Sequence, residues 1–408
     1  MHTTKNRAEH FSPNATKLIL AALLVWPAIG HSQTYIPDND DVIVEDLPSP
    51  IVAMSRELRS REVDSLSQLS PDALLQQAWQ AYRIAVSGQS PRAWGRTMSL
   101  LQRWPQSREK PADYHNLMAA VLQHNHEFSR AIEHLDMALA TDPDNSQAML
   151  IKAQIGLVNG QYAMAGEYCT RLRMLVRYPI SLNCQAQLDG VTGQAERALA
   201  DLDALLADSR NLNPGDRTEL RLTAAVISHR LARTQEAENH YRHALQLAPA
   251  TPYALVHYSS LLLESDRPAD VVTLLDAHPG EWLNTELRIL LAEALQSIGS
   301  DTAQARSRQL VEELQAEFDA TLLRGEAIPY KAFAHFSLNL LDRPGQALSA
   351  ARDNWSVQKE PSDTLLLARA AAASGDTTVL SEIGQWLEQT GTEHVRLRSL
   401  LRDAGVMP

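Results

Sequence analysis

One spacing of small residues recurs along the chain and limits the folds that it can adopt. The steps are 12, 7 and 5 residues, and the last position is proline. Three segments share these steps: Ala225, Ala237, Ala244 and Pro249; Ala119, Ala131, Ala138 and Pro143; and Ala81, Ala93, Leu100 and Pro105. Two helices approach closely only where both carry small side chains, and proline ends a helix. The spacing therefore predicts pairs of short packed helices.

This pattern resembles the tetratricopeptide (TPR) repeat, a helix pair of about 34 residues with alanines at the contacts and a closing proline. The resemblance is strongest at 74–105, 112–143 and 218–249. Weaker matches place Ala153, Ala165 and Leu172 in one further unit, and Ser259, Val271 and His278 in another. The resemblance to TPR repeats implies an all-α fold, namely a right-handed α-solenoid of antiparallel helix pairs (a TPR-like superhelix).

Amphipathic periodicity and loop signals place nineteen helices along the chain. The predicted ranges are 72–86, 91–104, 112–125, 128–141, 146–159, 162–176, 180–189, 194–208, 216–232, 234–247, 252–264, 267–277, 283–297, 301–321, 327–341, 344–358, 362–373, 377–389 and 392–404. Gly160, Gly193, Gly299 and Gly375 fall between successive helices, where a left-handed residue closes the turn.

The chain divides into four predicted parts: a signal peptide (1–32), an acidic, proline-containing extension (33–69), TPR-like repeats (70–250), and degenerate helix pairs with a C-terminal cap (251–408). A solenoid needs a cap with a polar outer face. In the last helix we expect Val395, Leu397, Leu400 and Leu401 to face inward and the arginines to face outward.

The N-terminus has the order of a secretory signal. Lys5, Arg7 and Lys17 precede the apolar run 18–29, and small residues follow it. We expect cleavage between Gly30 and Gln33, and hence a periplasmic or secreted protein with no integral membrane segment afterwards. The alternative is an uncleaved N-terminal anchor. Residues 33–56 carry five acids and three prolines, and form either a mobile N-terminus or a docking strand.

Composition narrows the classes of partner. Acidic residues outnumber lysine and arginine by 49 to 37, so the formal charge is -12. Sequence-independent nucleic-acid binding rests on neutralising phosphates, and an acidic chain is poorly suited to it. We therefore expect a protein or peptide partner and no nucleic acid. The oligomeric state stays open.

The only cysteines, Cys169 and Cys184, lie in neighbouring predicted helices. In an antiparallel hairpin the two thiols lie opposite each other, which permits a disulfide if both point inward. The alternative is two buried, unpaired thiols.

No catalytic motif is present, and we expect no enzymatic activity, no metal and no cofactor. His240 and His243 are three residues apart on a helix, but no third ligand is spaced to join them, and surface histidines are the preferred interpretation. His124 and His126 sit where a first helix ends.

A sugar-processing helical-repeat enzyme needs paired carboxylates beside tryptophans. Besides Trp26 of the predicted signal peptide, the chain has six scattered tryptophans: Trp79, Trp94, Trp104, Trp282, Trp355 and Trp386.

In TPR-like stacks the first helix of each pair lines a concave groove. Taking the contact alanines as buried, helical spacing gives the opposite stripe. Its members are Ala78, Tyr82, Ala85, Val86, Asn116, Ala120, Gln123, His124, Leu150, Gln154, Leu157, Val158, Leu222, Val226, His229, Arg230, Val256, Ser260, Leu263 and Glu264. The stripe mixes apolar side chains, amides and histidines. It suits a peptide segment, unless residues 33–56 or the curvature of the solenoid cover part of it.

The chain is thus predicted to be a periplasmic non-catalytic scaffold that binds a protein or peptide in its concave groove. The alternative is an accessory subunit or enzyme of an envelope polysaccharide or secretion system.

Overall fold

The computed structural model describes residues 69–86, 92–208, 212–280 and 283–407. The chain divides into two units, Met1–Asp64 and Ser65–Pro408, and the description below concerns the second. The predicted signal peptide and the acidic extension up to residue 68 lie outside the described residues, as does Trp282.

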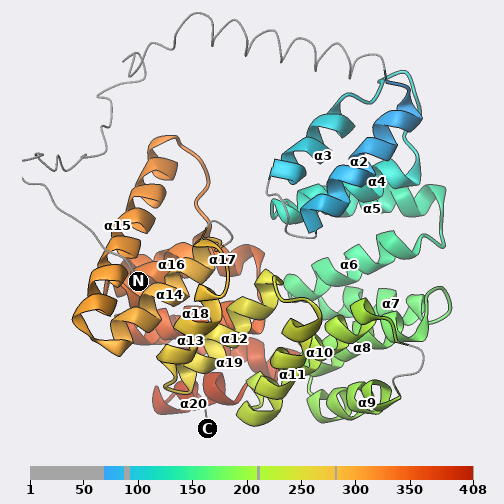
Figure 1. Cartoon of the computed structure of the whole chain (residues 1–408). Helices are drawn as coiled ribbons and strands as arrows, with labels where there is room; N and C mark the ends of the chain where they lie inside the picture. The colour runs from blue at the N-terminus through green and yellow to red at the C-terminus, as the bar shows by residue number, and fades with distance from the viewer. Residues whose placement is uncertain (1–68, 87–91, 209–211, 281–282, 408) are drawn as a thin grey trace, which may run out of the picture. The chain divides into compact units, whose positions relative to one another are not determined.

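Pairs of antiparallel helices make up the second unit, and the described residues contain no strand (Figure 1). The first helices of the pairs are α2 (Pro71–Val86), α4 (Ala112–His124), α6 (Ser146–Val158), α8 (Tyr178–Val191), α10 (Pro214–Arg230), α12 (Pro252–Glu264), α14 (Thr285–Ile298), α16 (Tyr330–Asn339) and α18 (Pro361–Ser374). The second helices are α3 (Arg92–Gln102), α5 (Phe128–Thr141), α7 (Tyr162–Leu172), α9 (Ala195–Ala207), α11 (Thr234–Leu247), α13 (Pro268–Asp276), α15 (Asp301–Leu323), α17 (Pro344–Val357) and α19 (Thr377–Thr390). A single helix, α20 (Val395–Asp403), ends the chain. The predicted α-solenoid is confirmed. Among the described helices, none combines the length and the apolarity needed to cross a membrane.

The pairs form two layers. Each first helix contacts the first helix of the next pair, from α2 through α18 and on to α20. Each second helix packs on its own partner. The first helices therefore form one continuous inner layer, and their free faces point to the same side of the solenoid.

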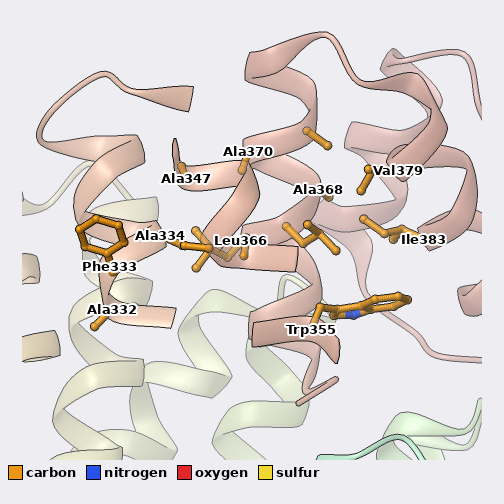
Figure 2. Packing of buried hydrophobic residues seen from close by; sticks show 14 of the residues in the cluster. Ala332, Phe333, Ala334, Ala347, Trp355, Leu366, Ala368, Ala370, Val379 and Ile383 are labelled. Carbon is orange, nitrogen blue, oxygen red and sulfur yellow. The ribbon is translucent and has the colours of Figure 1, made fainter. Parts of the chain in front are cut away.

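The predicted contact alanines lie inside this packing. Ala119, Ala131 and Ala138 are fully buried, and so are Ala225 and Ala237. Buried alanines also mark the helix contacts in the C-terminal half, where the sequence shows only amphipathic periodicity. There Ala334, Ala347, Ala368 and Ala370 pack among larger side chains such as Phe333, Trp355 and Ile383 (Figure 2).

Two details differ from the predictions. His278 is not a contact position, because α13 ends at Asp276 and Leu275 takes the buried place. In α20, Leu397 and Leu401 are buried as expected, but Val395 is 44% exposed. Arg396 does not face outward, because it forms an ion pair with Glu264 of α12.

The helix ends explain several turn residues. The four predicted turn glycines all have a positive φ, between 70° and 82°. His126, Ala232, Asp266 and Asp342 adopt the same left-handed region without being glycine. Asparagine, aspartate and histidine tolerate this region best among non-glycine residues. Ala232, at φ 57°, is therefore the strained member of the group.

We expect Ala232→Gly to stabilise the protein by about 0.5–1 kcal/mol, because glycine adopts a positive φ without steric cost. The matched control is Ala248→Gly. Ala248 also follows the end of a helix, α11, but its φ is −141°. That substitution only adds freedom to the unfolded chain and is expected to destabilise the protein. Urea unfolding midpoints of the two variants distinguish these outcomes, and a lower midpoint for Ala232→Gly would refute the strain argument.

Cys169 of α7 and Cys184 of α8 form a disulfide in the structure, with Cα atoms 5.5 Å apart. Both residues are buried among Met149, Ala153 and Tyr168. The bridge joins the second helix of one pair to the first helix of the next, so it ties two successive repeats together.

Candidate functional site

A cavity of about 540 Å³ opens on the inner layer in the C-terminal half of the solenoid. Its walls come from first helices α10, α12, α14, α16 and α18, and from α20 with the residue before it. The lining residues are Val226, His229, Arg230, Tyr253, Val256, His257, Ser260, Leu263, Glu264, Glu286, Leu290, Glu293, Lys331, His335, Asn339, Glu360, Pro361, Ser362, Leu365, Leu366, Arg369, His394, Arg396 and Leu400.

Contacts between distant repeats close one side of this cavity. The Lys359 amide donates to the Val158 carbonyl oxygen at 2.7 Å. The Thr392 hydroxyl donates to the Val191 carbonyl oxygen at 2.9 Å. The Ala195 amide donates to a Glu393 carboxylate oxygen at 2.9 Å. The segment between α19 and α20 is thereby held against α8 and α9, which places His394 and Arg396 at the cavity wall.

A cluster of charged groups lies where α14, α16 and α18 meet. Lys331 Nζ lies 3.4 Å from Asp363 Oδ1 and 3.5 Å from Glu286 Oε1. Burial opposes the charge of Lys331, but the surrounding carboxylates outweigh it and raise the lysine pKa. Burial, with the nearby Asp363 carboxylate, raises the pKa of Glu360 to about 7. At neutral pH the Glu360 carboxyl group can therefore either donate or accept a hydrogen bond.

The other acids of the cavity wall are engaged. Glu293 Oε1 lies 2.8 Å from His335 Nε2 and accepts from Asn339 Nδ2 at 2.6 Å. Glu264 Oε2 lies 2.6 Å from His229 Nε2 and also pairs with Arg396. Each of these carboxylates joins its helix to another helix, and each already interacts with donors of neighbouring side chains.

Arg230 differs from these paired groups. It is only 7% exposed, yet it lines the cavity. Its Nη2 donates to the Gly190 carbonyl oxygen at 2.8 Å. Its Nε and Nη1 have no hydrogen-bond partner among the described residues. The approach to α8 needs a glycine, since a Cβ on Gly190 would lie 2.8 Å from Ile227 and 3.1 Å from Arg230 Nη2.

Three histidines surround this arginine and are held neutral. Burial lowers the pKa of His257 and of His394 to about 3, and that of His229 to about 4. The positive charge of Arg230 contributes to each shift. The end of the cavity at Arg230 is therefore positively charged, and its histidines act as neutral donors or acceptors.

The structure brings together part of the predicted groove. Val226, His229, Arg230, Val256, Ser260, Leu263 and Glu264 all line the cavity. Other members of the stripe are buried in the core: Ala78, Ala85, Asn116, Ala120 and Leu222. Asn116 donates to the Asn145 side chain there, at 3.0 Å.

The remaining predicted residues belong to α2, α4 and α6, outside the cavity. Tyr82 contacts Trp79 and Trp94 edge to face, and the Trp94 ring stacks on His124 at 4.2 Å. Gln123 and Leu150 are half-buried, while Gln154 and Val86 are exposed.

Several cavity residues carry no signal in the repeat spacing. Lys331, Glu360 and His394 come from the degenerate C-terminal half, where charged residues resemble an ordinary solvated face. Only the curvature of the solenoid turns them toward α10. The one local feature that could indicate such cavity residues is a lysine or glutamate beside the inner face of a first helix.

The prediction of a surface histidine is wrong for His240, which is 3% exposed. Its ring is covered by Arg221 of α10 and Asp203 of α9, and a Glu236 oxygen joins them within 4.8 Å. A third acidic group thus lies beside His240, contrary to the sequence expectation. However, Arg221 Nη1 donates to His240 Nδ1 at 3.0 Å. The imidazole then carries its proton on Nε2, 3.6 Å from an Asp203 carboxylate oxygen, so charged side chains of neighbouring helices account for the contacts of the buried ring.

Tryptophans do not shape the cavity. Of those that the structure describes, Trp79, Trp94, Trp104, Trp355 and Trp386, none is part of its lining. Trp355 and Trp386 contact each other edge to face, and the Trp355 indole donates to Thr364 at 3.0 Å. None of these five tryptophans therefore offers a stacking surface to the cavity.

The layered helix pairs with small residues at their contacts define a TPR-like α-solenoid protein. Comparison with protein-family profiles finds no match, and comparison with curated protein sequences finds none either. Among solved structures the chain is similar to PilW, described as a type IV pilus biogenesis factor, at 19% identity and a TM-score of 0.41 over 52% of this chain and 96% of that one. It is also similar to a tetratricopeptide repeat protein from Parabacteroides merdae, at 15% identity and a TM-score of 0.35 over 71% of this chain and 97% of that one. Human IFIT1 in complex with PPP-AAAA matches at 11% identity and a TM-score of 0.48, over 79% and 72% of the two chains. Similarities this low transfer no partner or activity to this chain.

Proposed function

We propose that the protein is a non-catalytic scaffold of the periplasm or the extracellular space, and that it binds a polypeptide segment along its inner layer. The observation that carries the proposal is the continuity of the first helices from α2 to α18. Such a surface presents one long face to an extended or helical segment.

Several features of the inner layer support a polypeptide ligand. Tyr82 and His124 offer aromatic surface at the N-terminal end, and Gln154 offers an exposed amide between them and the cavity. Aromatic anchors and adaptable amides are typical of peptide-binding surfaces. The net charge of -12 argues against nucleic acid as the ligand.

The proposed location rests on the signal-like N-terminus and on the Cys169–Cys184 bridge. Disulfides persist in oxidising compartments and are rare in the cytosol. A protein exported by a cleaved signal would begin near Gln33.

Site-specific photocrosslinking in intact cells tests this function. A photoreactive amino acid is placed at Tyr82, Gln123 or Gln154 on the inner layer, and at Gln246 or Arg352 on exposed faces of second helices. We expect the same polypeptide to be captured from the inner positions and not from the outer ones. The mass of the crosslinked protein also reports whether the signal has been removed. Equal capture at inner and outer positions, or capture only at the outer ones, would contradict the proposal.

A further inference from the structure

Arg230 is a buried cation that forms no ion pair with an acidic side chain among the described residues. Its exposed fraction is 7%, and only one of its three nitrogen atoms has a hydrogen-bond partner among the described residues. A buried charge without a partner is costly, and so are buried donors without acceptors. An anion bound at this end of the cavity would offset both costs.

None of the described acids of the cavity forms an ion pair with Arg230, and Glu360 acts on it only at longer range. Glu264 and Glu293 are bound to histidines of the wall, and Glu286 lies beside Lys331. Glu393 acts on Arg230 only at longer range, since its carboxylate accepts from the Ala195 amide. Because no described carboxylate pairs with Arg230, we infer that a ligand supplies the complementary group.

The charges around Arg230 favour a monoanion. One guanidinium supplies one positive charge, and its planar fork matches a carboxylate. Glu360 and Glu393 both lie within electrostatic range of it. Their carboxylates repel a dianionic phosphate more strongly than a monoanionic carboxylate.

The rest of the cavity favours an apolar body on that ligand. Val226, Val256, Leu290, Leu366 and Leu400 line the walls beyond Arg230. A volume of about 540 Å³ is in the range of small-molecule sites. Because Arg230 is almost fully covered, a small free molecule reaches it more easily than a long chain does.

We propose that the cavity binds a small free monocarboxylate with an apolar body, such as a medium-chain aliphatic acid, and that its carboxylate pairs with Arg230. This ligand is separate from the proposed polypeptide partner. It gives the scaffold a second, low-molecular-weight binding site.

Calorimetric titration of the full mature chain with octanoate and octanamide tests the proposal. The two probes share an apolar body and differ in charge. We expect octanoate to bind about tenfold or more tightly than octanamide, as a buried charge-assisted pair implies. In Arg230→Gln this preference should disappear. It should persist in Arg306→Gln, because Arg306 is an exposed arginine paired with Asp276 outside the cavity.

Two further measurements keep the test decisive if Arg230→Gln fails to fold. Arg230→Lys keeps the charge and loses the fork, so it should retain part of the preference. In the wild-type protein, equal affinities for octanoate and octanamide, or no binding of either, would overturn the proposal without any variant.

Octyl phosphate should bind more weakly than octanoate. The free acid of N-acetyl-Ala-Ala-Leu serves as a polypeptide chain end, and its tighter binding than octanoate would contradict the assignment to a free acid.

Discussion

A shift from pH 7 to pH 5 is expected to destabilise the folded chain strongly, because the cavity holds three histidines in the neutral state. Burial lowers the pKa of His257 and His394 to about 3 and that of His229 to about 4, from an ordinary value of 6.5. The neighbouring arginines and lysine act in the same direction. Acidification must therefore place charge next to existing charge or unfold the chain.

The sign follows from proton uptake. Between pH 6.5 and about 4 the unfolded chain protonates these histidines and the folded chain does not, so stability falls as the pH falls. Each such group contributes about 1.4 kcal/mol per pH unit, against a typical total of roughly 5–15 kcal/mol. Glu360 works in the opposite direction, because its pKa is raised from 4.5 to about 7 and the folded state takes up its proton first. Burial also raises the pKa of Asp363 and of Glu219, but it lowers the pKa of His115 and of His240 to about 4, so the imidazoles leave a net loss of stability.

His394→Gln isolates the effect, because His394 is only 6% exposed and glutamine does not titrate. Unfolding free energies from urea titrations at pH 7 and pH 5 should show that the wild type loses about 2 kcal/mol more than this variant. Comparing the loss between the two pH values removes any constant cost of the substitution. His243→Gln, at an exposed position on α11, serves as the control and should behave as the wild type. If His394→Gln lost as much stability as the wild type, the buried imidazole would not be the cause.

The helices were predictable from the sequence because their signals are local. Ala119 and Ala131 mark a crossing of two adjacent helices, and Gly160 marks the turn after α6. Each feature depends on residues within one repeat. The same local spacing predicts that Val226, His229 and Arg230 share one face of α10, and all three line the cavity.

The cavity could not be predicted because it depends on contacts between residues far apart in the sequence. Thr392 meets Val191 only after the solenoid has turned through several repeats. Small rotations between successive pairs set this meeting, and no local motif encodes them. His240 was assigned to the surface for a related reason, since the helices that cover it belong to neighbouring pairs.

Enlarging one contact alanine should destabilise the protein far more than enlarging a neighbouring alanine on the same helix. Ala131 of α5 is fully buried and packs in the core shared with α4, whereas Ala140 near the end of α5 is exposed. Three extra carbons at Ala131 must push the two helices apart or force strained rotamers, which costs about 1–3 kcal/mol or more.

Urea unfolding of Ala131→Leu and Ala140→Leu, followed by circular dichroism, checks this expectation. Ala131→Leu should lower the free energy of unfolding by that amount, and Ala140→Leu should change it by less than about 0.5 kcal/mol. Leucine and alanine are both good helix formers, so neither result reflects helix propensity. Equal stability of the two variants would mean that α4 and α5 do not depend on a small residue at their crossing. The repeat spacing would then lose its physical explanation.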